Sequence, residues 1–176
     1  MLLSILAILA LMLIGLVLYG HLFVEDNVFT QYLQLQETSS RMSARAFEEF
    51  IDSSMRQMEV MAKDPDIVNL TADGKLKLQG LQAVMGGLVG NVTRLDKDMR
   101  IAYTFPADRQ ATGKYVGTQK HNVKLLETKR PLVGECFMAV QGYEAMPLVQ
   151  PVFKDGAFDG TLSIPVSYTH LTLPTN

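Results

Sequence analysis

The chain has 176 residues, which is the size of a single domain. Hydrophobic residues make up 48% of it and charged residues 19%, and the formal net charge is −2. This balance excludes a disordered acidic tail and a strongly basic protein that binds nucleic acid. Because Cys136 is the single cysteine, a fold held together by intrachain disulfides is also excluded.

Residues 1–24 are predicted to be a transmembrane helix. They contain no Asp, Glu, Lys or Arg, and Leu, Ile, Val, Met and Ala dominate them. A helix of this length rises about 36 Å, which is enough to cross a hydrocarbon core of about 30 Å. A cleaved signal peptide would have a basic start, a shorter apolar run and a cleavage site of small residues, and the sequence has none of these.

The flank of this segment favours an extracytoplasmic location for the rest of the chain. Glu25 and Asp26 come directly after the apolar run, and the nearest basic residue is Arg41. A flank poor in Lys and Arg is typical of the non-cytoplasmic side of a membrane. We therefore expect this fragment to pass once through the lipid bilayer of the inner (cell) membrane, with its soluble part outside the cytoplasm.

Residues 25–66 are predicted to form a long helix that emerges from the membrane. No Pro or Gly occurs between residues 27 and 63, and apolar residues recur with a helical period that is clearest from Phe47 onward. Pro65 marks the end, because the residue before a proline disfavours the helical conformation. We expect residues 27–45 to be a stalk through which two copies dimerise, and residues 46–63 to pack on the domain.

Met55, Met58 and Met61 lie on one face of this helix. Thioethers at such a spacing can bind Cu(I), but methionine is also a common filler of cores between helices and sheets. Because no other cluster of Met, Cys or His in the sequence supports a metal, we expect core packing, no metal and no cofactor. Cys136 is expected to be a buried residue within a strand.

Residues 67–165 are predicted to form an α+β domain with an antiparallel sheet of about five strands flanked by helices. Apolar periodicity predicts helices at residues 74–89 and 118–128, with a loop at 107–118. Alternation predicts strands at residues 91–95, 100–105, 132–141, 144–153 and 158–166. Asp155-Gly156 is a strong signal for a hairpin turn between the last two strands.

Short motifs occur in a fixed order between residues 28 and 165. They are Ala62-Lys63-Asp64-Pro65-Asp66-Ile67, Leu95-Asp96-Lys97-Asp98-Met99-Arg100-Ile101, Phe105-Pro106 with Gly113-Lys114-Tyr115-Val116-Gly117, Leu126-Glu127-Thr128-Lys129-Arg130-Pro131-Leu132-Val133, and Pro151-Val152-Phe153-Lys154-Asp155-Gly156-Ala157-Phe158-Asp159-Gly160. In order and spacing they resemble the Cache family of extracytoplasmic sensors, whose PAS-like domains follow a membrane-emergent helix. The chain resembles a single Cache domain or the first half of a double one. Met99 stands where the family's hairpin motif often has Gly.

The resemblance implies the ligand-sensing input region of a membrane signal-transduction receptor. Its output module would be a histidine kinase, a chemotaxis transducer or a cyclic-dinucleotide enzyme. Two alternatives stay open: a membrane-anchored periplasmic enzyme, or a structural adaptor, whose functional part comes later in the gene. We expect no catalysis from the present sequence, because it shows no paired carboxylates, no nucleophile–base pair and no zinc spacing.

The resemblance places a ligand pocket between the sheet and the segment over it, residues 107–124. Our candidate ligand-binding residues are Tyr103, Arg109, Tyr115, Lys120, Met138 and Tyr143. Tyrosines offer a stacking face and a hydroxyl, and Arg or Lys would pair with an anion. Residues 94–130 hold nine basic and four acidic residues. This excess fits either a solvated face or the attraction of a small anion such as a carboxylate.

Residues 166–176 resemble the translation of an adapter used in sequencing libraries. We therefore expect the chain to be a fragment of a truncated gene whose native part reaches about residue 165, and we exclude the tail from the prediction of the fold. Val166 and Ser167 can still lie near the end of a genuine strand.

Overall fold

The computed structural model describes residues 2–140 and 142–167. The chain divides into two compact units, residues 1–49 and residues 50–176. One helix, α1 (Leu2–Ala62), contributes to both, so the two helical segments predicted from the sequence are a single continuous helix. In the part of the chain that the structure describes, one stretch is long and apolar enough to cross a membrane, Leu3–His21. It lies within the predicted span of residues 1–24.

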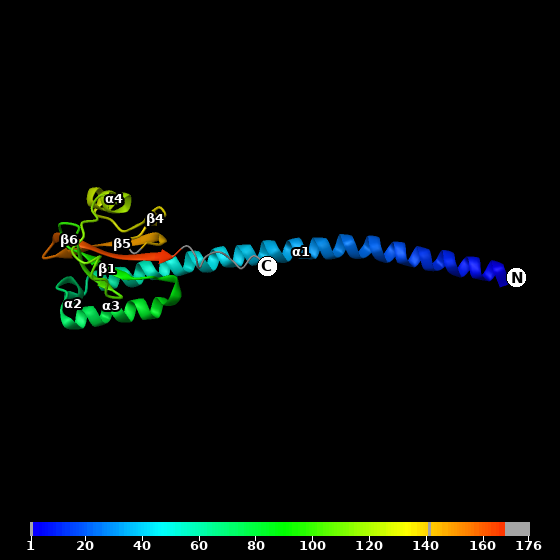
Figure 1. Ribbon diagram of the computed structural model, residues 1–176, viewed down its shortest axis with the longest axis horizontal. Helices are drawn as coiled ribbons and strands as arrows, with labels where there is room; N and C mark the ends of the chain where they lie inside the picture. The colour runs from blue at the N-terminus through cyan, green and yellow to red at the C-terminus, as the bar shows by residue number, and fades with distance from the viewer. Residues whose placement is uncertain (1, 141, 168–176) are drawn as a thin grey trace. The chain divides into compact units, whose positions relative to one another are not determined.

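The second unit is an antiparallel sheet covered by helices on both faces (Figure 1). The strands are β1 (Val92–Leu95), β2 (Ile101–Phe105), β3 (Leu132–Val133), β4 (Phe137–Met138), β5 (Glu144–Lys154) and β6 (Ala157–Ser167). Their order is β2-β1-β6-β5-β3, and β4 also pairs with β5. The predicted α+β class with flanking helices is confirmed, and the sheet has six strands rather than about five.

One face of the sheet packs on the end of α1, on α2 (Pro65–Val68) and on α3 (Ala72–Met85). Met58 of α1 is fully buried, as core packing predicts, and the Gln150 side chain of β5 donates a hydrogen bond to the Met55 carbonyl over 3.0 Å. The chain turns sharply after α1 because Asp64 caps α2, accepting a hydrogen bond from the Asp66 amide, with Pro65 in the first helical turn.

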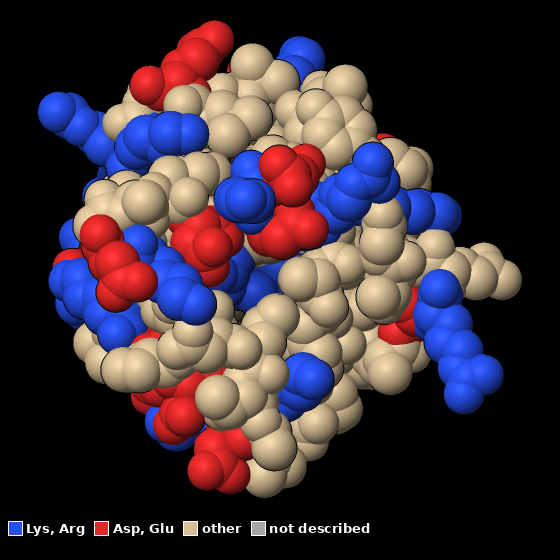
Figure 2. Space-filling view, turned by 90° about the vertical axis from the view of Figure 1, so that its left-hand side faces the viewer, with Lys and Arg blue, Asp and Glu red and all other residues tan. Residues whose placement is uncertain are grey.

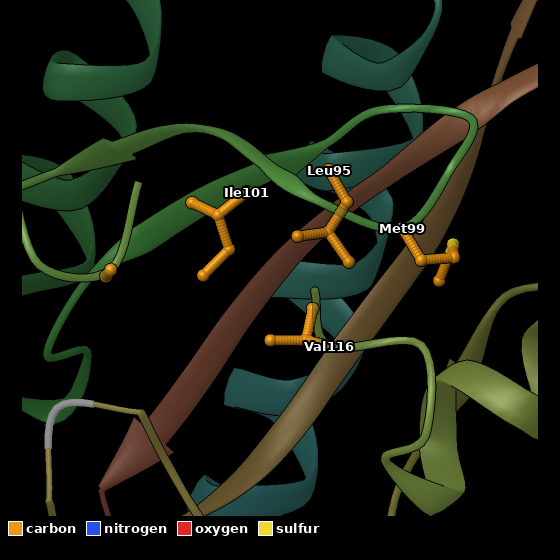
Figure 3. Packing of buried hydrophobic residues seen from close by; sticks show 5 residues of the cluster. Leu95, Met99, Ile101 and Val116 are labelled. Atoms are coloured by element: carbon orange, nitrogen blue, oxygen red, sulfur yellow. The ribbon is translucent and has the colours of Figure 1, made fainter. Parts of the chain in front are cut away.

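The other face is covered by residues 107–119, by helix α4 (Lys120–Thr128) and by the segment around β4. The loop is held to the sheet by backbone hydrogen bonds, from the Ile101 amide to the Lys114 carbonyl and from the Val116 amide to the Met99 carbonyl, each 3.0 Å. Leu95, Met99, Ile101, Ala111 and Val116 form a buried cluster beneath it (Figure 3). The loop is therefore part of the folded core.

Two tight turns agree with the sequence patterns. Asp155 and Gly156 adopt φ of 50° and 80°, and these positive values at both central positions are typical of the two-residue hairpin between β5 and β6. Met99 adopts φ of 58° at the end of the β1–β2 turn. This left-handed conformation explains why Gly is common at that position of the motif.

The strand predicted at residues 132–141 consists of two short strands, β3 and β4, because the ladder with β5 is interrupted between them; residue 141 lies outside the described residues. Pro147 lies opposite the interruption and has no N–H to donate. Gly134 donates its amide to the Pro147 carbonyl over 2.8 Å. Cys136 falls in this interruption and is exposed, so the expectation of a buried cysteine within a strand is wrong.

The helix boundaries differ slightly from the prediction at residues 74–89. Thr71 caps α3 by accepting the Gly74 amide over 3.1 Å, so the helix begins at Ala72. It ends at Met85, and a short 3₁₀ helix, η1 (Gly86–Leu88), follows. Gly86 adopts φ of 65°, which an α-helix cannot accommodate.

Strand β6 extends into the adapter-like segment. Val166 is fully buried and pairs with Met146, and Ser167 pairs with Ala145. Val166 and Ser167 thus lie at the end of a strand, the alternative that the sequence left open for these two positions. Residues 168–176 lie outside the described residues.

A buried ion pair joins β1 to β6 on the face covered by α1. The Arg94 side chain is 2% exposed, and its Nη2 donates to Asp159 Oδ2 over 2.7 Å. Asp159 occupies an irregularity in the β5–β6 ladder, where Val152 pairs with Gly160 and Phe153 with Phe158. Arg94 also donates to the carbonyls of Asp159 and Val68, at 3.0 and 3.4 Å, so it connects the sheet to the end of α2.

Removing the carboxylate should destabilise the domain strongly. We expect Asp159→Ala to lower the free energy of unfolding by about 3 kcal/mol, because it leaves a buried guanidinium without its counter-charge. The double variant Arg94→Met/Asp159→Ala should regain most of this loss, because an apolar side chain needs no partner. The measurement is urea unfolding of the full chain in detergent micelles, followed by near-ultraviolet circular dichroism. Equal stability of Asp159→Ala and the exposed control Asp98→Ala would contradict the assignment.

Candidate ligand-binding site

A small cavity lies between the sheet and the cover formed by residues 107–128 and the β4 segment. Its floor consists of Asn91, Thr93, Leu95, Ile101, Ser163 and Pro165. Its roof consists of Val116, Gln119, His121, Asn122, Phe137, Ala139 and Val140. The cavity is partly open to solvent, and its volume is about 40 Å³. On the same measure one water molecule needs about 10–15 Å³, so the space within the cavity holds only a few non-hydrogen atoms.

The floor carries a connected set of hydrogen bonds. Asn91 Nδ2 donates to Thr93 Oγ1 over 2.7 Å, and the hydroxyls of Thr93 and Thr104 lie 3.3 Å apart. The Tyr143 hydroxyl donates to Asn91 Oδ1. Burial raises the pKa of Tyr143 to about 12, so the phenol keeps its proton at neutral pH and remains a donor. This network fixes the orientation of the Asn91 amide at one side of the cavity.

The roof is built from the start of α4. Asn122 is 1% exposed, and its Nδ2 donates to the Val116 carbonyl over 2.9 Å and to Gln119 Oε1 over 3.3 Å. Asn122 Oδ1 is buried and accepts no hydrogen bond from the described residues. Asn122 is thus a lining residue of the cavity that carries a buried, unpaired acceptor.

His121 lies next to Asn122 and is uncharged. Its ring packs edge to face against Phe137, with centroids 4.5 Å apart, and the residue is 5% exposed. Burial lowers the pKa of His121 from 6.5 to about 4, because the imidazolium would lose its hydration there. Each lining residue that the structure describes is thus uncharged at neutral pH.

Tyr143 is the one predicted site residue that contacts the cavity lining, through Asn91. Tyr103 lies on the opposite face of the sheet, where Gln79 donates to its hydroxyl over 3.3 Å and the Lys75 ammonium lies 5.9 Å from its ring. The reason is a bulge: Arg94 pairs with Tyr103 but Leu95 pairs with Ile101. The extra residue, Ala102, reverses which face each later side chain of β2 occupies.

The other four predicted residues lie at the surface. Tyr115 is 53% and Met138 61% exposed, and Arg109 is exposed in the loop. The Lys120 ammonium lies 3.4 Å from Glu135 Oε2, and both side chains are largely exposed. Acidic and basic side chains alternate over the end of the domain shown in Figure 2. The cations on which the expectation of an anionic ligand was based are thus outside the cavity lining.

The sequence analysis missed the polar residues of the lining. In α4, apolar residues pointed to Val123, Leu125 and Leu126, yet the buried residues are His121, Asn122 and Leu125. A buried face that includes two polar side chains gives no apolar periodicity. The one available signal was the alternation of Asn91 and Thr93 at the start of β1, which places two polar side chains on the same face of the sheet.

The buried histidine predicts an acid-sensitive stability. In the unfolded chain His121 takes up a proton near pH 6.5, whereas the folded chain takes it up near pH 4. The unfolded state therefore binds more protons between these values, and stability should fall by about 3 kcal/mol as the pH drops from 6.5 to 4. The measurement is urea unfolding of the full chain across this range, with His121→Gln as the variant that loses this component. A His121 titration midpoint near 6.5 by NMR would contradict the prediction.

Comparison with known families identifies the domain. The sequence model of the family described as HK/GC/Chemotaxis protein-like, sensor domain, matches residues 57–167, which is more than half of the chain. No curated protein matches the chain. The matched residues contain the whole sheet, α2, α3 and α4, and the cavity between them.

Solved structures with the same fold are receptor domains. The ligand-binding domain of the Pseudomonas aeruginosa PAO1 amino acid chemoreceptor PctC, in complex with GABA, is 18% identical with a TM-score of 0.56; the match covers 78% of this chain and 62% of that one. The ligand-binding domain of Campylobacter jejuni chemoreceptor Tlp3, in complex with 4-methylisoleucine, is 16% identical with a TM-score of 0.58, covering 76% and 56%.

An extracellular ligand-binding receptor from Desulfohalobium retbaense DSM5692 is 18% identical with a TM-score of 0.54, and the match covers 72% of this chain and 26% of that one. The chain therefore spans less than two thirds of each of these structures. At these identities the likeness shows the fold, which is that of chemoreceptor sensor domains. Together with the family match, it confirms the resemblance to extracytoplasmic sensors: the chain belongs to the family of HK/GC/chemotaxis protein-like sensor domains.

Proposed function

We propose that this chain is the extracytoplasmic input region of a membrane receptor and senses a small molecule in the cavity under α4. The observation that carries the proposal is the buried, unpaired Oδ1 of Asn122, a residue that lines a partly open cavity within a domain of a sensor family. A buried acceptor without a donor is costly, so a molecule that supplies the donor gains binding free energy there. The output would be a histidine kinase, a chemotaxis transducer or a cyclic-dinucleotide enzyme.

The sheet provides the connection between the cavity and α1. Thr93 and Ser163 line the cavity, while their neighbours Arg94 and Leu162 are buried on the face covered by α1. A ligand that shifts β1 or β6 would therefore alter the surface on which the end of α1 packs. Signalling requires only that the ligand bind two such arrangements with different affinities.

We also propose that the segment Leu3–His21 crosses the inner membrane and that the protein forms a homodimer through α1. The length and composition of Leu3–His21 support the span. Val28, Leu35 and Met42, at seven-residue spacing, are 57%, 71% and 66% exposed. An apolar repeat of seven is typical of helices that pack against a second helix. We further propose that the domain binds and does not catalyse, which is supported by a lining of amides, hydroxyls and a neutral imidazole.

The topology can be tested with reporter fusions. Alkaline phosphatase fused after Ser167, where β6 ends, should be active in a bacterial host, because the enzyme folds only outside the cytoplasm. A β-galactosidase fusion at the same position should be inactive. The reverse pattern would place residues 25–167 in the cytoplasm and contradict the proposed location.

Ligand binding can be tested with a panel and a variant that fills the cavity. We expect one or more compounds among small carboxylates, amines, amino acids and neutral amides to stabilise the full chain in detergent micelles. The gain is about 2.7 kcal/mol at a concentration one hundred times the Kd. Ala139→Leu should abolish the stabilisation, because the added carbons occupy the cavity, whereas Ala102→Leu at an exposed position should preserve it. Stabilisation that survives Ala139→Leu, or a panel without effect, would contradict the proposal.

A further inference from the structure

We infer that the cavity under α4 is selective for a small uncharged molecule with an N–H or O–H group that donates to Asn122 Oδ1. This inference rests on the proposed sensing function and names the chemical class of the ligand. It differs from the sequence-based expectation of a carboxylate. Three features of the described residues carry it: the unpaired acceptor, the absence of charge from the lining, and the size of the space.

The orientation of the Asn122 amide is fixed by its neighbours. Its Nδ2 faces two acceptors, the Val116 carbonyl and Gln119 Oε1, at 2.9 and 3.3 Å. A reversed amide would place an oxygen against both acceptors and lose both hydrogen bonds. Oδ1 therefore remains the atom without a partner, and only a donor can satisfy it. A carboxylate offers acceptors alone and would be repelled.

The lining also provides no counter-charge for an ion. The lining residues are apolar or neutral, and burial keeps His121 uncharged at neutral pH. The cations Arg109 and Lys120 are exposed, and Lys120 lies beside Glu135. An anion, an ammonium or a zwitterion would lose its hydration on entry without gaining an ion pair, which disfavours all three.

The dimensions limit the ligand further. The cavity is partly open, and its volume of about 40 Å³ corresponds to a few non-hydrogen atoms. A primary amide of this size carries N–H groups for Asn122 and a carbonyl that can accept from a hydroxyl such as that of Ser163. A short amide is therefore the probe that fits the lining best, and affinities in the millimolar range are expected for so small a molecule.

The test uses three probes of nearly equal size: acetamide, acetate and acetone. They differ in charge and in the ability to donate, so each isolates one part of the inference. The full chain in detergent micelles is titrated with each probe, and the amide resonances of Gln119, His121 and Ser163 are followed by NMR. We expect acetamide to bind at least about tenfold more tightly than acetate or acetone. Asn122→Leu should weaken acetamide binding about tenfold or more, whereas Arg109→Ala and Lys120→Ala should leave it unchanged.

The outcomes separate this inference from the proposed function. If acetate binds as tightly as acetamide and its binding is lost in Ala139→Leu, the inference that the ligand is uncharged is overturned. This result would still support sensing in the cavity. Acetone binding as tightly as acetamide would overturn the role of the donor. If none of the three probes binds, but another compound of the panel binds the wild-type chain and not Ala139→Leu, the inference about the ligand class is overturned and the proposed sensing function is kept. Failure of every compound would overturn both. If Asn122→Leu does not fold, the relative affinities of the three probes for the wild-type chain still test the inference about the ligand class.

Discussion

The buried guanidinium of Arg94 is the constraint on which the domain depends. Burial alone would lower its pKa, and the adjacent Asp159 opposes this, so the charge is retained inside the fold. Such a group is tolerated only where a counter-charge and hydrogen-bond partners accompany it. Here the two Nη groups reach β6 and the Val68 carbonyl at the end of α2, whereas Nε is buried without a partner among the described residues. One side chain thus requires the sheet, the ladder irregularity at Asp159 and the chain after α1 to be in place together.

The two faces of β1 carry different polar side chains, because successive residues of a strand point to opposite faces of the sheet. Arg94 faces the helices and Thr93 faces the cavity, one residue apart. On the helix face the Nη groups of Arg94 donate to Asp159 and to the Val68 carbonyl. On the cavity face Asn122 Oδ1 has no donor among the described residues. The ion pair and the unpaired acceptor therefore lie on opposite sides of the sheet.

Local sequence signals predicted the elements but not the composition of the site. The helix end at Pro65, the Asp155-Gly156 hairpin and the two long C-terminal strands follow from turn chemistry and alternation, which act over a few residues. The bulge that turns Tyr103 to the other face, and the interruption opposite Pro147, arise from pairing between distant segments. The family resemblance predicts a ligand pocket between the sheet and its cover, where the structure has a cavity. Side-chain charge alone selected Arg109 and Lys120, which are exposed.

The interruption between β3 and β4 gives this protein a built-in attachment point for a spectroscopic label. Cys136 is the chain's single thiol, it is exposed, and it directly precedes Phe137 in the roof of the cavity. A maleimide dye or nitroxide would react at this position without an engineered cysteine. Movements of the cover could then be followed as changes in emission or in spin mobility, in the native sequence and in an intact membrane.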